Sequence, residues 1–119
     1  MPYKKFTLVI PATPLSGNQY TRLHWRERDK LTTAWGFLVG SSIHGKAWFD
    51  RASVEAVFYF KESRTRDIPN FMVTLDKLII DHLKGRIIPD DNSDVLPEWT
   101  VRFEVDKASP RTVVTLTAM

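Results

Sequence analysis

The chain has 119 residues, of which 43% are apolar and 26% are charged, so we expect one folded domain over residues 1–119 rather than a disordered chain. It contains no cysteine, which excludes disulfides, thiolate metal sites and cysteine nucleophiles, and no apolar run approaches the roughly 20 residues of a membrane span. The formal net charge of +3 does not by itself indicate a nucleic-acid partner, and the composition fits the cytoplasm.

The first half of the chain predicts a strand, a helix and a second strand. Residues 3–10 alternate between apolar and polar side chains, which is typical of a strand, and the prolines and residues 15–18 that follow indicate a turn. From residue 26 to residue 44 the apolar side chains recur at helical spacing, which predicts an amphipathic helix. Residues 53–60 are rich in Val, Phe and Tyr and predict another strand.

The second half predicts a helix followed by two strands. The helix covers residues 71–84, with Asn70 as its N-cap and Gly85 directly after its C-terminus. Residues 99–105 alternate cleanly, and a turn leads to a last strand at residues 112–117. The order β-α-β-α-β-β predicts a compact α+β fold, in which a small mixed sheet of about four strands is covered by two helices.

One face of the second predicted helix is polar. At about 100° per residue, Asn70, Thr74, Lys77 and Asp81 fall on a single narrow stripe. The ordinary interpretation is a solvated helix face that carries a Lys77–Asp81 ion pair. The acidic residues on either side of the helix favour a second interpretation, in which the stripe faces a site.

Acidic residues stand before and after this helix. Asp67 precedes it, and Asp90 and Asp91 follow it. Hard divalent cations such as Mg²⁺ bind carboxylate oxygens, and these two segments can meet if the chain folds back along the helix. They can equally be capping and loop residues, and the spacing alone leaves both interpretations open.

These motifs resemble the RusA family of Holliday-junction resolvases, in particular its phage and prophage members. That family has an Arg-Asp-x-Asp-Asn segment that opens a helix, a lysine with an aspartate four residues later, and a glycine-containing turn before an Asp-Asp pair. The corresponding residues here are Arg66-Asp67-Ile68-Pro69-Asn70, Lys77, Asp81, Gly85 and Asp90-Asp91. The segment from Pro14 to Asn18 is also similar to the opening segment of the family, so the resemblance covers most of the chain.

The resemblance implies a Mg²⁺-dependent endonuclease, with Mn²⁺ as a substitute, which cleaves four-way or related branched DNA as a homodimer in recombination and repair. It implies that Asp67 and Asp91 bind the metal and that Asp90 is either a third ligand or the residue that orients Asp91. Lys77 is implied to lie close to the attacked phosphate. Asp81 is implied to position Lys77 or to bind the metal through water.

Two groups of basic residues are candidate contacts for the DNA backbone. Arg64 and Arg66 flank the predicted site and suit phosphate contacts. Arg22, Arg26 and Arg28 surround the start of the first predicted helix, where an ordinary solvated helix start is the alternative.

One position departs from the family pattern. Pro69 stands where the family has its second aspartate, and a proline side chain cannot bind a metal. The alternative function is therefore a branched-DNA-binding protein with weak or lost catalysis. A more remote alternative is a small interaction domain in which the aspartates are only loop residues.

Overall fold

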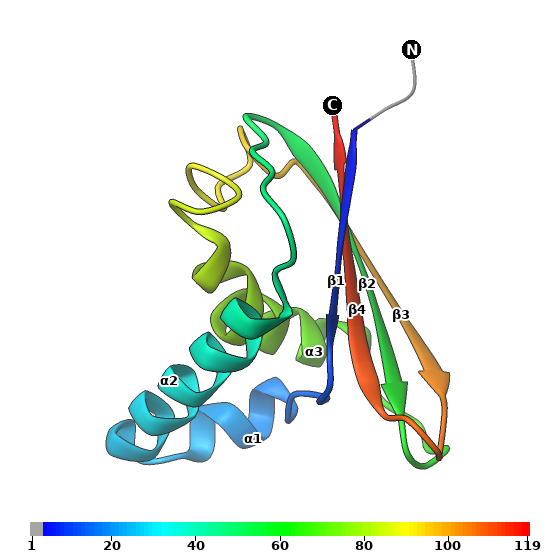
Figure 1. The fold of residues 1–119 in the computed structure, drawn as a ribbon. Helices are drawn as coiled ribbons and strands as arrows, with labels where there is room; N and C mark the ends of the chain where they lie inside the picture. The colour runs from blue at the N-terminus through cyan, green and yellow to red at the C-terminus, as the bar shows by residue number, and fades with distance from the viewer. Residues whose placement is uncertain (1–3) are drawn as a thin grey trace.

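The computed structural model describes residues 4–119 and confirms an α+β fold (Figure 1). Residue 3, which begins the first predicted strand, lies outside the described residues. The elements follow in the order β1 (Lys5–Ile10), α1 (Gly17–Arg22), α2 (Trp25–Ser42), β2 (Ala52–Phe60), α3 (Ile68–Thr74), a π-helical turn η1 (Leu75–Ile79), a 3₁₀ turn η2 (Ile80–Leu83), β3 (Glu98–Val105) and β4 (Arg111–Ala118). None of the helices in residues 4–119 is both long and apolar enough to span a membrane.

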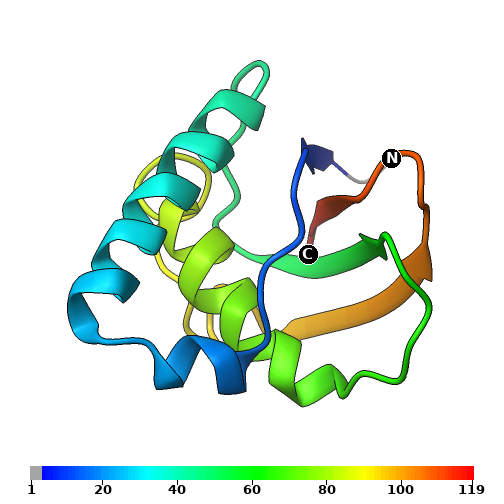
Figure 2. The same cartoon turned by 90° about the horizontal axis from the view of Figure 1, so that it is seen from below.

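The four strands form one mixed sheet in the order β1-β4-β2-β3. Strand β4 is antiparallel to both β1 and β2, whereas β2 and β3 are parallel. Parallel strands need a long crossover connection, and here it contains α3, η1 and η2. Figures 1 and 2 show the helices gathered on one face of the sheet, so the crossover lies between α2 and the strands.

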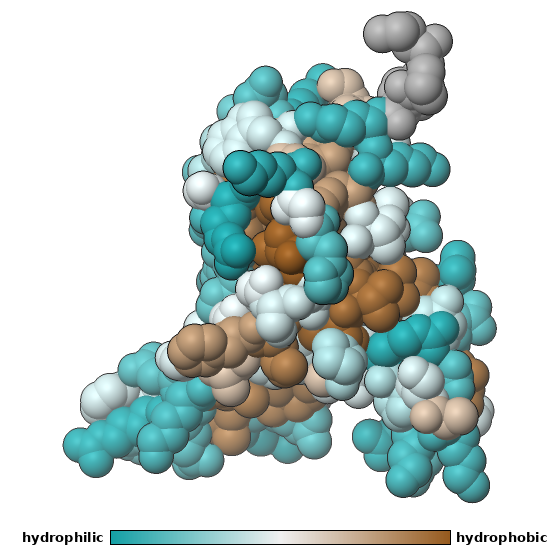
Figure 3. Space-filling model, viewed as in Figure 1, coloured by the Kyte–Doolittle hydropathy of each residue, from teal (hydrophilic) through white to brown (hydrophobic). Residues whose placement is uncertain are grey.

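The core lies between the helical layer and the covered face of the sheet. Strand β2 turns Val54, Ala56 and Phe58 toward the helices, because alternate side chains of a strand point to the same face. The crossover helix covers them with fully or almost fully buried apolar side chains, namely Phe71, Leu75, Leu78, Ile79, Ile80 and Leu83. The apolar side chains in Figure 3 accordingly concentrate where helices and sheet meet, with hydrophilic residues around them.

Residues 15–18, predicted to be a turn, contain the start of a short helix. The side chain of Ser16 accepts a hydrogen bond from the Gln19 backbone, and the Gln19 side chain bonds back to Ser16, which is a capping box. Helix α1 packs closely on α3, since a Cβ atom on Gly17 would lie 2.7 Å from the Asn70 carbonyl oxygen. The prediction of a simple turn was therefore wrong.

The crossover helix is irregular, although the sequence predicts one regular helix over residues 71–84. It begins at Ile68, so Asp67 and not Asn70 occupies the N-cap position. The Asn70 side chain accepts a hydrogen bond from the Asn18 backbone instead, at 2.8 Å. Thr74 is fully buried, so the predicted polar stripe was wrong at this position. The helix ends as predicted, with Gly85 at a positive φ of 78°.

Candidate functional site

Three aspartates meet where the crossover helix and the loop after it come together. Asp76 lies on η1, Asp81 lies on η2, and Asp91 lies in the loop between η2 and β3. Each offers one carboxylate oxygen, and these three oxygens lie within 4.8 Å of one another. All three residues are partly buried. We call this group the three-aspartate cluster.

The π-helical turn explains how Asp76 and Asp81 face the same way. In a regular α-helix, residues five positions apart point about 140° away from each other around the axis. In η1 the Ile80 backbone N–H donates to the carbonyl of Leu75, five residues earlier, as well as to that of Asp76. Such wider turns bring residues five apart to nearly the same side of the helix, and π-bulges are frequent at functional sites.

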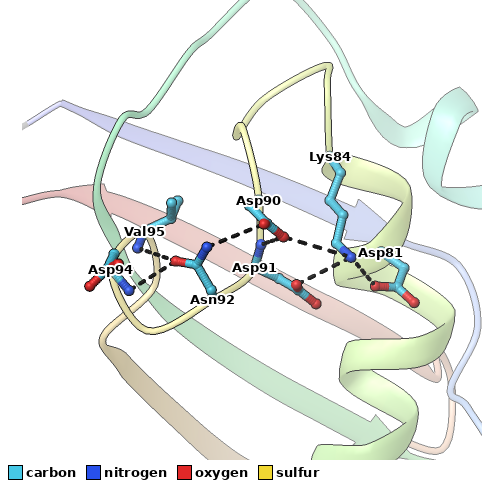
Figure 4. A network of polar contacts seen from close by, with 7 residues as sticks. All are labelled: Asp81, Lys84, Asp90, Asp91, Asn92, Asp94 and Val95. Atoms are coloured by element: carbon cyan, nitrogen blue, oxygen red, sulfur yellow. Dashed lines mark hydrogen bonds and ion pairs between the residues drawn. The ribbon is translucent and has the colours of Figure 1, made fainter.

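The loop after the helix holds Asp91 in place through its own hydrogen bonds (Figure 4). The Asp90 carboxylate accepts from the Asp91 backbone N–H at 2.7 Å and from the Asn92 side-chain amide at 3.2 Å. The Asn92 side-chain oxygen in turn accepts from the backbone of Asp94 and Val95, at 3.0 and 3.1 Å. Asp90 therefore holds the backbone of Asp91. That it orients Asp91 as a metal ligand, one of the two roles expected for it, remains a prediction.

Lys84 points its ammonium group into the cluster (Figure 4). The Lys84 Nζ atom lies 3.0 Å from Asp81 Oδ1, 3.2 Å from Asp91 Oδ1 and 3.9 Å from Asp90 Oδ1. These contacts raise the pKa of Lys84 and offset the repulsion between neighbouring carboxylates. Asp81 thus forms its ion pair with Lys84, where the sequence predicted a pair with Lys77.

The cluster shifts the ionisation of its members in opposite directions. Burial, followed by the nearby Asp91 and Asp81 carboxyls, raises the pKa of Asp76 to about 7. Hydrogen bonding with Asp76, followed by contact with Lys84, lowers the pKa of Asp91 to about 2. The charge of Lys77 acts on Asp76 in the opposite sense to burial and favours its ionised form. At neutral pH, Asp91 is a carboxylate and Asp76 is close to half-protonated.

The donor set of the cluster fits a hard divalent cation. All three donors are carboxylate oxygens, which suit Mg²⁺ or Mn²⁺. The Oδ1 atom of Asp76 is buried and accepts no hydrogen bond within the described residues. A buried oxygen without a partner is unfavourable, and a cation at the cluster would satisfy it. Asp76, Asp81 and Asp91 are the residues that would hold such an ion.

Two residues of this site were not predicted. The spacing of a regular helix places Asp76 away from Asp81, so only the π turn identifies it. Lys84 had a signal in the sequence, because it stands three residues after Asp81 and directly before the helix-ending Gly85. Positions three apart on a helix are neighbours, and the last helical turn favours basic side chains.

Asp67, which was expected to share a site with Asp91, lies elsewhere. It is exposed at the start of α3, and the helix between Asp67 and Asp76 spans about 13 Å at ~1.5 Å per residue. Within residues 4–119, the three-carboxylate group includes the expected Asp81 and Asp91 but neither Asp67 nor Asp90. The expected Lys77 is exposed on η1, beside Asp76.

Asp67 instead borders a basic groove between α1 and the loop that precedes α3. Arg22, Arg64 and Arg66 all line this groove, together with polar groups of α1. The Arg66 guanidinium stacks on the Phe60 ring, 3.7 Å from its centroid, and donates to the Glu62 carbonyl at 3.1 Å. We call this surface the arginine groove, and it unites three of the five arginines expected to bind DNA.

The other two arginines lie on the first turn of α2. Arg26 is exposed, and its guanidinium lies 5.3 Å from the centre of the exposed Trp25 ring. Arg28 is partly buried. Neither lines the arginine groove. Their role as DNA contacts remains a prediction.

Neither the models of known protein families nor the curated proteins include a match to this chain.

Proposed function

We propose that this protein is a metal-dependent endonuclease that cleaves four-way or related branched DNA in the manner of the RusA family. The observation that carries the proposal is the convergence of Asp76, Asp81 and Asp91 on one point. Of these, Asp81 and Asp91 belong to the motif that resembles the family. A Mg²⁺ or Mn²⁺ ion bound there would activate a water molecule and stabilise the negative charge that develops on the attacked phosphate.

The other residues around the cluster would orient the reacting groups. Asp90 orients Asp91 through the hydrogen bond from the Asp91 backbone. Lys77 is exposed beside Asp76, where its ammonium can meet a phosphate oxygen as a point charge. These roles need no ligand at position 69. Pro69 therefore does not leave the site short of carboxylates, because Asp76 supplies the third.

The arginine groove suits contact with the sugar-phosphate backbone on one side of the phosphodiester that the cluster would cleave. It lies at the α3 end of the crossover helix, whereas the cluster lies at the η1 and η2 end. Arg22, Arg64 and Arg66 would fix the position of the strand without reading its sequence. The proposal includes a homodimer, because symmetric cleavage of a four-way junction needs two sites related by a two-fold axis.

Binding without cleavage is the second candidate function. It is the function expected if the aspartate that Pro69 replaces in the family motif is essential for cleavage, even with Asp76 as a third carboxylate. In that case the arginine groove still binds branched DNA, whereas the cluster binds metal poorly or only stabilises the loop.

Incubation with a synthetic four-way junction and Mg²⁺ or Mn²⁺ distinguishes these functions. We expect paired nicks that require the divalent cation and that are abolished by Asp76→Asn or Asp91→Asn. Asp29→Asn, an exposed substitution on α2, is the matched control and should cleave normally. Tight junction binding without nicks under all metal conditions would favour the second candidate. The absence of both binding and nicking would contradict both.

A further inference from the structure

We propose that Lys84 competes with the divalent cation for the three-aspartate cluster, so that the Lys84 ammonium must leave when the metal binds. The inference rests on the proposed metal-dependent function and concerns the regulation of that same site. The cluster already holds a cation, and that cation belongs to the chain itself.

The geometry places the ammonium on the same oxygens that a metal needs. Lys84 Nζ lies 3.0 Å from Asp81 Oδ1 and 3.2 Å from Asp91 Oδ1, so it pairs with two of the three cluster carboxylates. It also lies 3.9 Å from Asp90, the residue that orients Asp91. Within residues 4–119, Asp76 Oδ1 is the one atom of the cluster that is buried and accepts no hydrogen bond.

Two cations on the same carboxylates oppose one another. The repulsion between an ammonium and a divalent ion falls with distance, so it is largest when both contact the same oxygens. Asp81 and Asp91, the two carboxylates that already pair with the ammonium, would have to be shared between both cations. Binding of the metal is therefore coupled to departure of Lys84, and the coupling lowers the apparent metal affinity.

Lys84 is free to leave. Its side chain is 38% exposed and stands at the end of the helix, directly before Gly85. A lysine ammonium is carried on a flexible four-carbon stem and is strongly hydrated, so solvent can accept it readily. In the metal-free chain the same ammonium keeps the carboxylates together by neutralising part of their charge. Lys84 thus keeps the cluster assembled but makes the metal bind more weakly.

The test compares metal binding by the full chain and by Lys84→Met, which keeps most of the apolar stem and removes the charge. Lys107→Met, in the exposed turn between β3 and β4, removes the same charge far from the cluster and is the matched control. Titration with Mn²⁺ is followed by electron paramagnetic resonance of the free ion. We expect Lys84→Met to bind Mn²⁺ roughly fivefold more tightly, which corresponds to the loss of one partly exposed ion pair. The control should match the wild type.

A second measurement uses the unaltered chain. The rate at which an acylating reagent modifies the Lys84 amine should rise when Mn²⁺ is added, while the rate at Lys107 stays constant. Equal or weaker Mn²⁺ binding by Lys84→Met, or a Lys84 labelling rate that Mn²⁺ does not raise, would overturn the inference and leave the metal site standing. If neither the wild type nor Lys84→Met binds Mn²⁺, the proposed metal site and the inference are overturned together.

Discussion

Asp76 is the residue at which protonation and folding are most strongly linked. Its pKa of about 7 in the folded chain is far above the ordinary aspartate value of 3.8, because burial and the neighbouring carboxyls disfavour its charge. The folded chain therefore binds this proton more tightly than the unfolded chain. The free energy of unfolding that depends on Asp76 is fully present below pH 3.8 and is lost as the pH rises through 7. The free energy of unfolding that depends on Asp91, whose pKa is about 2, is present above pH 3.8 and is lost as the pH falls through 2.

Asp76→Asn should accordingly stabilise the metal-free chain at high pH. The amide cannot ionise, so the advantage of the variant over the wild type should grow from about pH 4 to about pH 7 and then level off. Above pH 7 the gain should exceed the roughly 0.5 kcal/mol of an ordinary surface substitution. Urea unfolding in the presence of a chelator measures the difference at each pH. Asp29→Asn is the control. A difference in stability between Asp76→Asn and the wild type that does not change with pH would contradict the raised pKa of Asp76.

Asp90 would act on a bound metal only through Asp91, whereas the cluster members would contact the metal themselves. Its carboxylate holds the Asp91 backbone and the Asn92 side chain. Asp90→Asn should therefore weaken Mn²⁺ binding by about 10- to 100-fold, the usual cost of losing a group that orients a ligand. Asp91→Asn should weaken binding further, since it removes a ligand. Calorimetric titration of both variants checks this order, and an Asp90 variant with wild-type affinity would remove Asp90 from the site.

Among the elements, the contact between α1 and α3 depends on a single glycine. A Cβ atom on Gly17 would meet the Asn70 carbonyl at 2.7 Å and the Val73 Cβ atom at 3.0 Å, so the two helices must move apart. Gly17→Ala should cost about 1–3 kcal/mol of unfolding free energy, as overpacking usually does. Urea unfolding measures this cost.

Gly40→Ala is the matched control for that substitution. A Cβ atom at Gly40 would meet only the end of the flexible Arg86 side chain, at 3.1 Å. Since alanine favours the helix by up to about 1 kcal/mol relative to glycine, Gly40→Ala should be neutral or stabilising. If both alanine variants unfold alike, the close approach of α1 to α3 does not constrain the fold.

The repeat of apolar side chains explains which strands and helices could be predicted from the sequence. The strands and helix α2 were found within two residues of their ends, because each buries one face and repeats its apolar side chains accordingly. Helix α1 was missed because six residues are too few for a repeat, and its only signal is the capping box at Ser16 and Gln19. The crossover helix was predicted to begin three residues too late and was wrongly expected to be regular.

That irregularity also explains why only part of the site could be predicted. Asp81, Asp90 and Asp91 were identified from motif and spacing, and all three surround the Lys84 ammonium. Asp76 was missed because a regular helix turns it away from Asp81, whereas the π turn restores the two to one side. Asp67 was wrongly placed in the site because the order of the motifs does not reveal how much helix separates Asp67 from the cluster.

Over the whole molecule, the positive and negative surfaces lie at different ends of one helix. The cluster gathers carboxylates at η1 and η2, and the arginine groove gathers guanidinium groups at the start of α3. A net charge of +3 conceals this separation. DNA held by the groove would extend toward the cluster, so binding and cleavage should respond to different substitutions.

Substitutions in the arginine groove should weaken binding of four-way junctions uniformly across sequences and leave metal affinity unchanged. Each phosphate contact that is lost should lower the slope of log affinity against log salt by about 1, because fewer counterions are released. Arg22→Ala and Arg64→Ala test this in filter-binding titrations at several salt concentrations. Arg102→Ala, which removes an exposed arginine paired with Glu104 on β3, is the control. A salt slope that stays at the wild-type value in both groove variants would exclude the groove as a backbone contact, whatever the state of the metal site.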